Sequence, residues 1–214
     1  MFNLIVIMAI MVIVAIVVIA FLLGSVPWGL VISKLFFHKD LREEGSGNIG
    51  TTNAIRSMGK VGGYAVFVLD FGKGVLSGLI ALWLVQRFGL DSTWRDIAVA
   101  AAFFGCVWGH IFCPWLGFKG GKGIAVAVGC LFVTFGPIGA LLELAIFIVL
   151  VAVTKYVSVG SMAAALACPF FALYFFWGNW PAWLLCTITG LTVFWAHRGN
   201  LARLRAGEER RLGH

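Results

Sequence analysis

Residues 4–23 read LIVIMAIMVIVAIVVIAFLL, an apolar stretch without a single charged residue. In a helix, about 20 such residues rise roughly 30 Å, which is the thickness of the hydrocarbon layer of a membrane. No Lys or Arg precedes the stretch and no small-residue cleavage site follows it, so it lacks the pattern of a signal peptide. It predicts the retained first span of a membrane protein.

The rest of the 214-residue chain has a similar character, since it is 61% hydrophobic and only 12% charged, with a mean hydropathy of +1.00. Water-soluble domains carry about twice that share of charge. No internal repeat, low-complexity tract or flexible linker divides the chain. These features predict one all-α domain over residues 1–214, a polytopic membrane helical bundle. Its further apolar segments lie at about 61–86, 96–116, 123–154, 159–178 and 181–196.

The number of spans depends on the segment 123–154, which is interrupted by GPIG at 136–139. This segment is either one tilted span or two short helices joined by a turn. Two crossings place all the Lys and Arg residues of the loops on one side, apart from Arg87 and Arg95, whereas one crossing removes this asymmetry. Positively charged loops stay on the cytoplasmic side. We therefore expect seven transmembrane helices, with the N-terminus outside and the C-terminus in the cytoplasm.

The stretch GSGNIG at 45–50 fits the dinucleotide fingerprint G-x-G-x-x-G, but its surroundings do not. Such a loop follows a buried strand, and the preceding residues KDLREE do not form one. The chain has no G-x-S-x-G motif, the turn that carries the nucleophilic serine of many hydrolases. Its histidines are not spaced as metal ligands. The five cysteines are scattered in or beside apolar stretches, as small core residues are. We expect no cofactor, no metal and no nucleic acid.

Polar residues concentrate in four segments, which the predicted topology places at the cytoplasmic face. They are 45–56 (GSGNIGTTNAIR), Gly109-His110 with 118–123 (FKGGKG), 155–161 (KYVSVGS) and 197–203 (HRGNLAR). Loops that meet on one face of a helical bundle form a site in a way that a lone motif does not. The sequence therefore predicts a polar site at this end of the bundle.

The first segment has the chemistry of an anion site. Its glycines allow backbone N–H groups to turn inward together around an anion. Thr52 or Asn53 can cap a short helix whose N-terminus also favours anions. Arg56, one turn later, adds a guanidinium suited to phosphate.

The second segment places Lys119 and Lys122 among glycines, before a helix that starts near Ile124. It is not a Walker A loop, because Leu116 stands at the position of the leading glycine and Gly123 at that of the Ser or Thr. Lysines that snorkel to lipid headgroups need no glycines, so we predict a phosphate-binding loop. The snorkelling alternative is more plausible for Lys119.

Histidines and one charged pair complete the candidates. His110, at the end of the third span, has the pattern of a packed or capping residue. His197 and Asn200 share one helix face, and His197 is the stronger functional candidate. Asp70 and Lys73 are spaced i to i+3 inside a span, where an ion pair is as consistent with a structural role as with a functional one.

The motifs GSGNIGTTNAIR, Gly109-His110 with GFKGGKGIA, and His197-x-x-Asn200-x-x-Arg203 occur in this order along the chain. Together they resemble the bacterial acyl-phosphate-dependent glycerol-3-phosphate acyltransferases, membrane enzymes with seven spans. The resemblance covers essentially the whole chain. It implies transfer of an acyl group from acyl phosphate to the 1-hydroxyl of glycerol 3-phosphate, which gives lysophosphatidic acid and phosphate and begins phospholipid synthesis.

The resemblance also implies a place and partners. The protein is expected in the bacterial cytoplasmic membrane, surrounded by membrane lipid, with its active site facing the cytoplasm. Acyl phosphate and glycerol 3-phosphate are its expected substrates, and the soluble enzyme that makes acyl phosphate is the protein partner to test. Because acyl phosphate is already activated, alignment and charge stabilisation are enough and no acyl-enzyme is required.

By this resemblance Ser46 and Arg56 match essential residues of the first motif, Lys122 with its glycines matches a phosphate-binding part, and Ser161 helps to hold the acceptor. The predicted catalytic residues are Ser46, His197 and Asn200, with either His197 or a substrate phosphate as the base. The predicted phosphate-binding residues are Gly45, Gly47, Asn48, Thr52, Asn53, Arg56, Lys119, Gly120, Gly121, Lys122, Gly123 and Ser161. The chain departs from the family pattern at Cys113-Pro114, Val126 and Ala196.

Two other classes of function are weighed against this one. An anion transporter or channel usually has discontinuous helices and polar groups at the membrane midplane, whereas the polar groups here gather at one face. A noncatalytic membrane assembly protein needs neither the lysine-glycine loop nor His197. Acyltransferases of the soluble-headed type carry H-x-x-x-x-D, and here Trp115 and Ala202 stand at the positions of the acid.

Overall fold

The computed structural model describes residues 2–212 and, over that range, consists of helices and short loops. A single 3-10 turn, Pro114–Leu116, follows the fourth helix. The α-helices are α1 (Phe2–Ser25), α2 (Trp28–Phe37), α3 (Thr51–Arg87), α4 (Ser92–Ile111), α5 (Ile124–Thr134), α6 (Gly136–Thr154), α7 (Val157–Phe175), α8 (Trp180–Ala196) and α9 (Arg198–Ala206).

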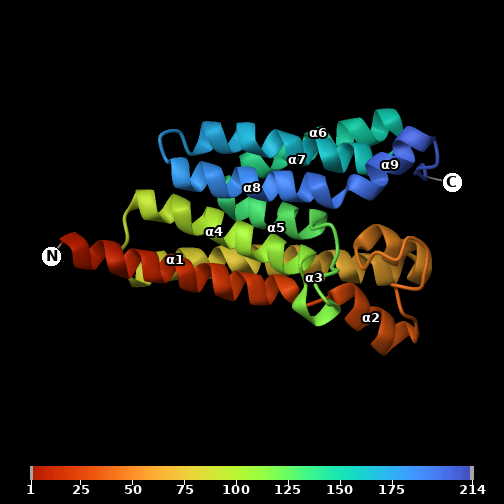
Figure 1. The fold of residues 1–214 in the computed structure, drawn as a ribbon, viewed down its shortest axis with the longest axis horizontal. Helices are drawn as coiled ribbons and strands as arrows, with labels where there is room; N and C mark the ends of the chain where they lie inside the picture. The colour runs from red at the N-terminus through yellow and green to blue at the C-terminus, as the bar shows by residue number, and fades with distance from the viewer. Residues whose placement is uncertain (1, 213–214) are drawn as a thin grey trace.

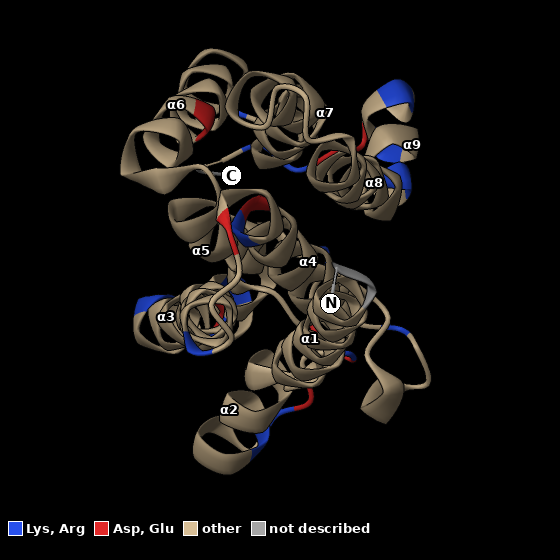
Figure 2. Cartoon of the chain, turned by 90° about the vertical axis from the view of Figure 1, so that its left-hand side faces the viewer, with Lys and Arg blue, Asp and Glu red and all other residues tan. Residues whose placement is uncertain are grey.

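The helices form a bundle in which α1 and α3 to α8 run side by side along the long axis (Figure 1). α1 packs on α4, α3 packs on α4 and α5, and α6, α7 and α8 follow one another in sequential pairs. α2 and α9 lie at the end of the bundle that holds the C-terminus, and the N-terminus lies at the opposite end. A view along the bundle shows mainly uncharged helix bodies (Figure 2). The predicted all-α fold is confirmed.

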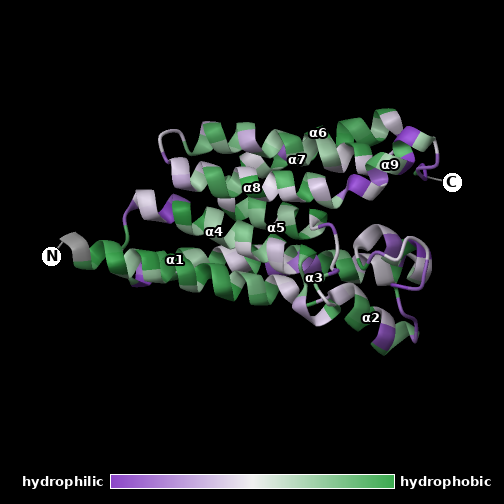
Figure 3. Cartoon of the chain, viewed as in Figure 1, coloured by the Kyte–Doolittle hydropathy of each residue, from purple (hydrophilic) through white to green (hydrophobic). Residues whose placement is uncertain are grey.

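Five helical segments are long and apolar enough to cross a membrane, and they include α1, α3, α4, α6 and α7. Hydrophobic residues make up most of the helix bodies, and hydrophilic residues gather towards the ends (Figure 3). The predicted break in 123–154 is confirmed, because α5 ends at Thr134 and α6 begins at Gly136. α5 and α8 are shorter than the roughly 20 residues that a full span needs. The count of seven spans therefore stays a prediction.

α5 is short because the segment before it turns into the bundle. The backbone N–H groups of Gly120 and Gly121 donate to the carbonyl oxygens of Ile111 and His110, at 3.0 and 3.1 Å. Buried backbone N–H groups need hydrogen-bond partners, and these two carbonyl oxygens supply them. A methyl group on Gly120 would lie 1.9 Å from the carbonyl oxygen of His110, so only glycine allows this approach. The loop 117–123 thus carries Lys122 inward.

α3 begins at Thr51, with Gly50 as its N-cap and no side-chain cap. The prediction that Thr52 or Asn53 caps this helix is wrong, because both lie inside its first turn. Gly59 interrupts the helix with φ 74° and ψ −176°. A short helix therefore precedes the long apolar one.

A cluster of ionisable side chains is buried between α3 and α4. Asp70 Oδ1 lies 2.8 Å from Lys73 Nζ, which confirms the predicted pair. Lys73 Nζ also lies 3.0 Å from His110 Nδ1 and donates to the carbonyl oxygen of Val26 at 2.9 Å. His110 is 4% exposed and its ring packs against Gly121, where a methyl group would lie 2.1 Å from Nε2. The cluster ties α3, α4 and the loop 117–123 together.

Candidate functional site

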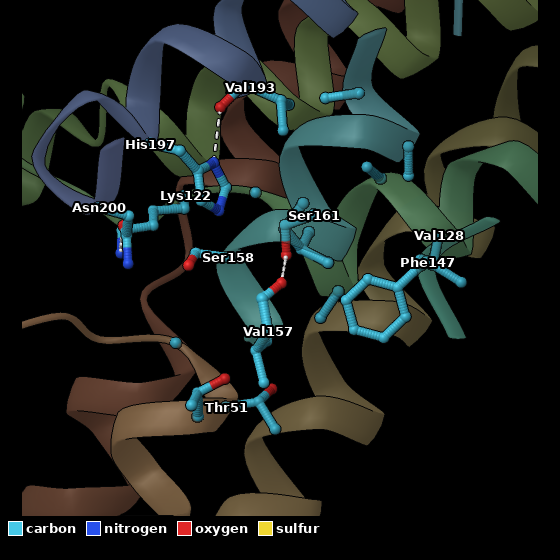
Figure 4. A pocket seen from close by; sticks show the side chains of 18 of the residues that line it. Thr51, Lys122, Val128, Phe147, Val157, Ser158, Ser161, Val193, His197 and Asn200 are labelled. Carbon is cyan, nitrogen blue, oxygen red and sulfur yellow. Dashed lines mark hydrogen bonds between the residues drawn. The ribbon is translucent and has the colours of Figure 1, made fainter. Parts of the chain in front are cut away.

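The four polar segments line one cavity of about 580 Å³. Its walls come from 45–56, the end of the loop 117–123, the start of α7, and 197–203, together with the C-terminal tail 208–210. The cavity continues from this polar end between apolar faces of α5, α6, α7 and α8, in which Val128, Leu144, Ala165 and Val193 take part. Figure 4 shows labelled side chains of both parts. The predicted convergence of the segments is confirmed.

The first loop is held in shape by Asn53, which is 2% exposed. Its Nδ2 donates to the carbonyl oxygens of Leu41 and Glu44 at 3.1 and 3.0 Å, and its Oδ1 accepts from the backbone N–H of Ser46 at 2.9 Å. Gly45 has φ +57°, and a methyl group there would lie 2.4 Å from Asn53 Oδ1. Asn53 therefore positions the Ser46 loop through its own hydrogen bonds.

Lys122 lies at the centre of a polar network. Its Nζ donates to Asn200 Oδ1, while Asn200 Nδ2 donates to Glu209 Oε1 at 2.5 Å. Glu209 Oε2 accepts from Arg203 Nε at 2.8 Å. Burial, followed by the nearby positive charge of Arg203, lowers the pKa of Lys122 to about 8. Lys122 is therefore mainly charged at pH 7 and is held where an anion would stabilise that charge.

His197 follows α8 directly and is 3% exposed. Its Nδ1 lies 2.8 Å from the carbonyl oxygen of Val193, and because a carbonyl only accepts, Nδ1 carries the proton (Figure 4). The neutral ring then has a free lone pair on Nε2. Burial lowers the pKa of His197 to about 4, against a smaller opposing contribution from the Val193 hydrogen bond. His197 is thus neutral at pH 7 and has the protonation state of a base.

Hydroxyl groups complete the polar wall. Ser161 is 2% exposed and donates to the carbonyl oxygen of Val157 at 2.9 Å (Figure 4). The Ser158 hydroxyl is buried beside the Glu209 carboxyl group, and the Thr51 hydroxyl is buried with no hydrogen-bond partner among the residues that the structure describes. Polar groups of this kind are usually satisfied, so the unpartnered Thr51 hydroxyl marks a place where a ligand can bond.

The comparisons with known proteins agree with this site. Residues 14–207 match the family described as glycerol-3-phosphate acyltransferase. The chain is 39% identical over 197 residues to a glycerol-3-phosphate acyltransferase of Thermosynechococcus vestitus, with 91% of this chain and 92% of the relative covered. This chain belongs to the glycerol-3-phosphate acyltransferase family. A relative from Listeria monocytogenes with the same description is 37% identical over 193 residues, which cover 90% of this chain and 93% of the relative.

Solved structures of an acyltransferase of this kind have the same fold. The crystal structure of PlsY, described as an integral membrane glycerol 3-phosphate acyltransferase in its glycerol 3-phosphate form, aligns with a TM-score of 0.81 at 37% identity. The alignment covers 94% of this chain and 96% of that one. Its lysophosphatidic acid form aligns with a TM-score of 0.78 at 35% identity, over 94% and 95% of the two chains. The protein is a multi-pass membrane protein.

Most residues that we predicted for an acyltransferase site line the cavity. They are Gly45, Ser46, Asn48, Thr52, Asn53, Arg56, Lys122, Gly123, Ser161, His197 and Asn200. Gly47 lines a smaller pocket of about 150 Å³ that also borders Ser46 and Lys122.

Three predicted residues are not among those that line either pocket: Lys119, Gly120 and Gly121. Lys119 is exposed, as the snorkelling alternative expects. Gly120 and Gly121 pack on the end of α4 instead, so their lack of a side chain serves the path of the loop. Their contribution to the site is to place Lys122.

Sequence reasoning missed several polar residues of the cavity wall, above all Ser158 and Glu209. Ser158 is three residues before Ser161, so helical spacing on α7 was a signal for it. Glu209 lies beyond α9 in a tail that folds back, where the backbone N–H of Leu212 donates to the carbonyl oxygen of Lys155 at 2.7 Å. No local pattern indicates that return.

Proposed function

We propose that this protein transfers an acyl group from acyl phosphate to the 1-hydroxyl of glycerol 3-phosphate, giving lysophosphatidic acid and phosphate. The observation that carries the proposal is the two-part cavity. Its polar end presents Lys122, Arg56 and Arg203, and its other part is apolar. An acyl phosphate likewise has a charged phosphate end and an apolar acyl chain. The acceptor carries a second phosphate, which accounts for basic side chains from three different segments of the chain.

In this proposal the reaction proceeds by direct attack. The 1-hydroxyl oxygen of glycerol 3-phosphate forms a bond to the carbonyl carbon, and its proton passes to His197 Nε2. The bond between the carbonyl carbon and the phosphate oxygen then breaks, and the leaving phosphate takes up the proton. A neutral, buried imidazole with its Nδ1 proton fixed by Val193 suits this transfer.

The remaining residues bind and orient the substrates. Lys122, fixed to Asn200, offers a charge to a substrate phosphate, and the backbone around Ser46 offers N–H groups. Ser46 polarises a substrate oxygen and stays unacylated, since the donor is already activated. Ser161 and Ser158 bond the acceptor from α7.

The donor is the part of the proposal to test first. Purified protein is given glycerol 3-phosphate and the same acyl group as acyl phosphate or as acyl-CoA, and lysophosphatidic acid is measured. We expect product from acyl phosphate and at most a trace from acyl-CoA. Equal or faster reaction with acyl-CoA would contradict the proposed donor.

We also propose that the polar end of the bundle faces the cytoplasm of a bacterial cell, with seven spans, because the loops at that end carry most of the basic residues. All five native cysteines are buried, so a cysteine added after Leu212 provides a clean label. It should react with an impermeant thiol reagent only after the cells are opened. Ready labelling of intact cells would reverse the orientation. Contact with the soluble enzyme that makes acyl phosphate stays a prediction.

A further inference from the structure

Two carboxyl groups of the helix bodies line the cavity, that of Asp70 on α3, which is paired with Lys73, and that of Glu143 on α6. Ala140, Leu144 and Phe147 line the cavity from the same helix, at the i, i+3, i+4 and i+7 spacing of a single helix face with Glu143. Glu143 is therefore part of the wall that surrounds the apolar space.

Among the described residues, the carboxyl group of Glu143 has no ion-pair partner, and one of its oxygens has no hydrogen-bond partner. Glu143 is 4% exposed, and its Oε2 atom has no hydrogen-bond partner among the described residues. Asp70 and Lys73, also buried in the bundle, neutralise each other. Ionisable residues inside a membrane are expensive and by default functional, so an unpaired one in a cavity wall calls for a role.

The depth of Glu143 follows from the packing of α6 on α7. A methyl group on Gly160 would lie 2.7 Å from the carbonyl oxygen of Phe147, and one on Gly139 would lie 2.7 Å from the ring of Phe175. The two helices are thus antiparallel, and Glu143 lies near the level of Cys168. Ser158, at the polar end, is separated from Cys168 by a rise of about 15 Å. An extended chain of ~1.5 Å C–C bonds advances about 1.25 Å per carbon, so about twelve carbons cover this distance.

Beyond Glu143, at the end of the bundle where α6 begins, aromatic rings pack against one another. Phe135, at the junction of α5 and α6, has its ring centroid 6.3 Å from that of Phe171, 5.2 Å from that of Phe175 and 5.8 Å from that of Phe176. An acyl chain that enters from the polar end meets the carboxyl group of Glu143 before it meets this aromatic wall.

We propose that Glu143 is a specificity-determining residue that sets the length of the acyl chain accepted by the enzyme. This inference rests on the proposed function, because it takes the apolar part of the cavity as the place of the acyl group. Methylene groups of the acyl chain that lie between the polar end of the cavity and Glu143 gain apolar contact. Those that reach it must press against a polar group whose oxygen they cannot bond.

The test compares acyl phosphates from eight to eighteen carbons with the wild type, Glu143→Ala and Glu143→Gln in one detergent at one protein-to-detergent ratio. The ratio of variant to wild-type kcat/KM at each chain length cancels the partitioning of the donor into micelles. Leu142→Ala is the matched control, since Leu142 is the neighbouring residue and is 55% exposed on the bundle surface. Glu143→Ser shortens the side chain while keeping a polar group, in case the alanine variant does not fold.

Removing the end of the side chain makes room for about two methylene groups, each worth about a fourfold change, or about 0.8 kcal/mol. For Glu143→Ala and Glu143→Ser we expect ratios near one up to about ten carbons and a rise of about fifteenfold beyond about twelve. Glu143→Gln, of the same length, and Leu142→Ala should give flat ratios. Flat ratios for the shortened side chains, or a rise with Glu143→Gln, would overturn the inference. If the wild type transfers no acyl group from any acyl phosphate, the proposed function has failed instead.

Discussion

The replacement of Lys122 by alanine tests how this site binds phosphate. Lys122 is charged at pH 7 in a largely buried position, and burial has lowered its pKa from 10.5 to about 8. A shift of that size corresponds to about 3 kcal/mol against the charged form. A bound phosphate recovers this energy by providing the missing counter-charge. We therefore expect Lys122→Ala to lower kcat/KM for glycerol 3-phosphate by about 100-fold.

The lowered pKa of Lys122 also predicts how Lys122→Ala affects stability: the replacement weakens activity but does not destabilise the fold. The pKa of Lys122 is lower in the folded protein than its ordinary value, so the charged side chain disfavours folding below pH 8. This effect fades as pH rises from about 8 to above 10.5. Lys122→Ala should consequently melt at the same temperature as the wild type at pH 7, or above it.

The assay is the initial rate against glycerol 3-phosphate concentration, in one detergent, with a melting curve for each variant. Lys119→Ala is the matched control, because Lys119 is in the same loop but is exposed and does not line the cavity. It should change kcat/KM by less than about threefold. Near-wild-type kinetics for Lys122→Ala, or an equal loss for Lys119→Ala, would refute the reasoning.

Further predictions concern the base, the charge and the loop. His197→Gln should lower kcat by about 10²–10⁴-fold at unchanged melting temperature; a loss below tenfold would make a substrate phosphate the base. Wild-type kcat/KM should fall above pH about 8 as Lys122 loses its proton, and the residual activity of Lys122→Arg should lack this decline, since a guanidinium stays charged. Gly121→Ala should lower both activity and melting temperature, because the added methyl group would meet a buried histidine ring at 2.1 Å; a fully active variant would show that the loop tolerates movement. Rapid-quench mass spectrometry during turnover should find no acyl group on Ser46, whereas stoichiometric acylation would require a two-step mechanism.

Much of this fold can be predicted because lipid imposes simple rules on a sequence. Residues 4–23 have to be a helix, and the positions of the basic loops identify which ends of the helices lie together. The break at Gly136-Pro137 could also be predicted, because only two crossings of the segment 123–154 place the basic loops on one side of the membrane. The same counting predicted that the segments 45–56 and 197–203 meet, which the structure confirms.

The roles of single residues within the site were harder to predict. Gly120 and Gly121 have the composition of an anion-binding loop, yet they allow a close approach to α4, and both demands select glycine. The expected helix cap at Asn53 is wrong, because its amide holds the loop before it, and its contact with phosphate stays a prediction. Glu209 depends on a long-range return of the chain. Such roles follow from tertiary contacts, which local patterns do not contain.

The most direct test of the central claim is a stoichiometry measurement on the purified protein with acyl phosphate and glycerol 3-phosphate as the only substrates. Lysophosphatidic acid and inorganic phosphate are measured in the same samples over time. One cavity that joins the two substrates directly predicts equal amounts of both products, formed only when glycerol 3-phosphate is present. Phosphate release without the acceptor, or no lysophosphatidic acid at all, would contradict the account.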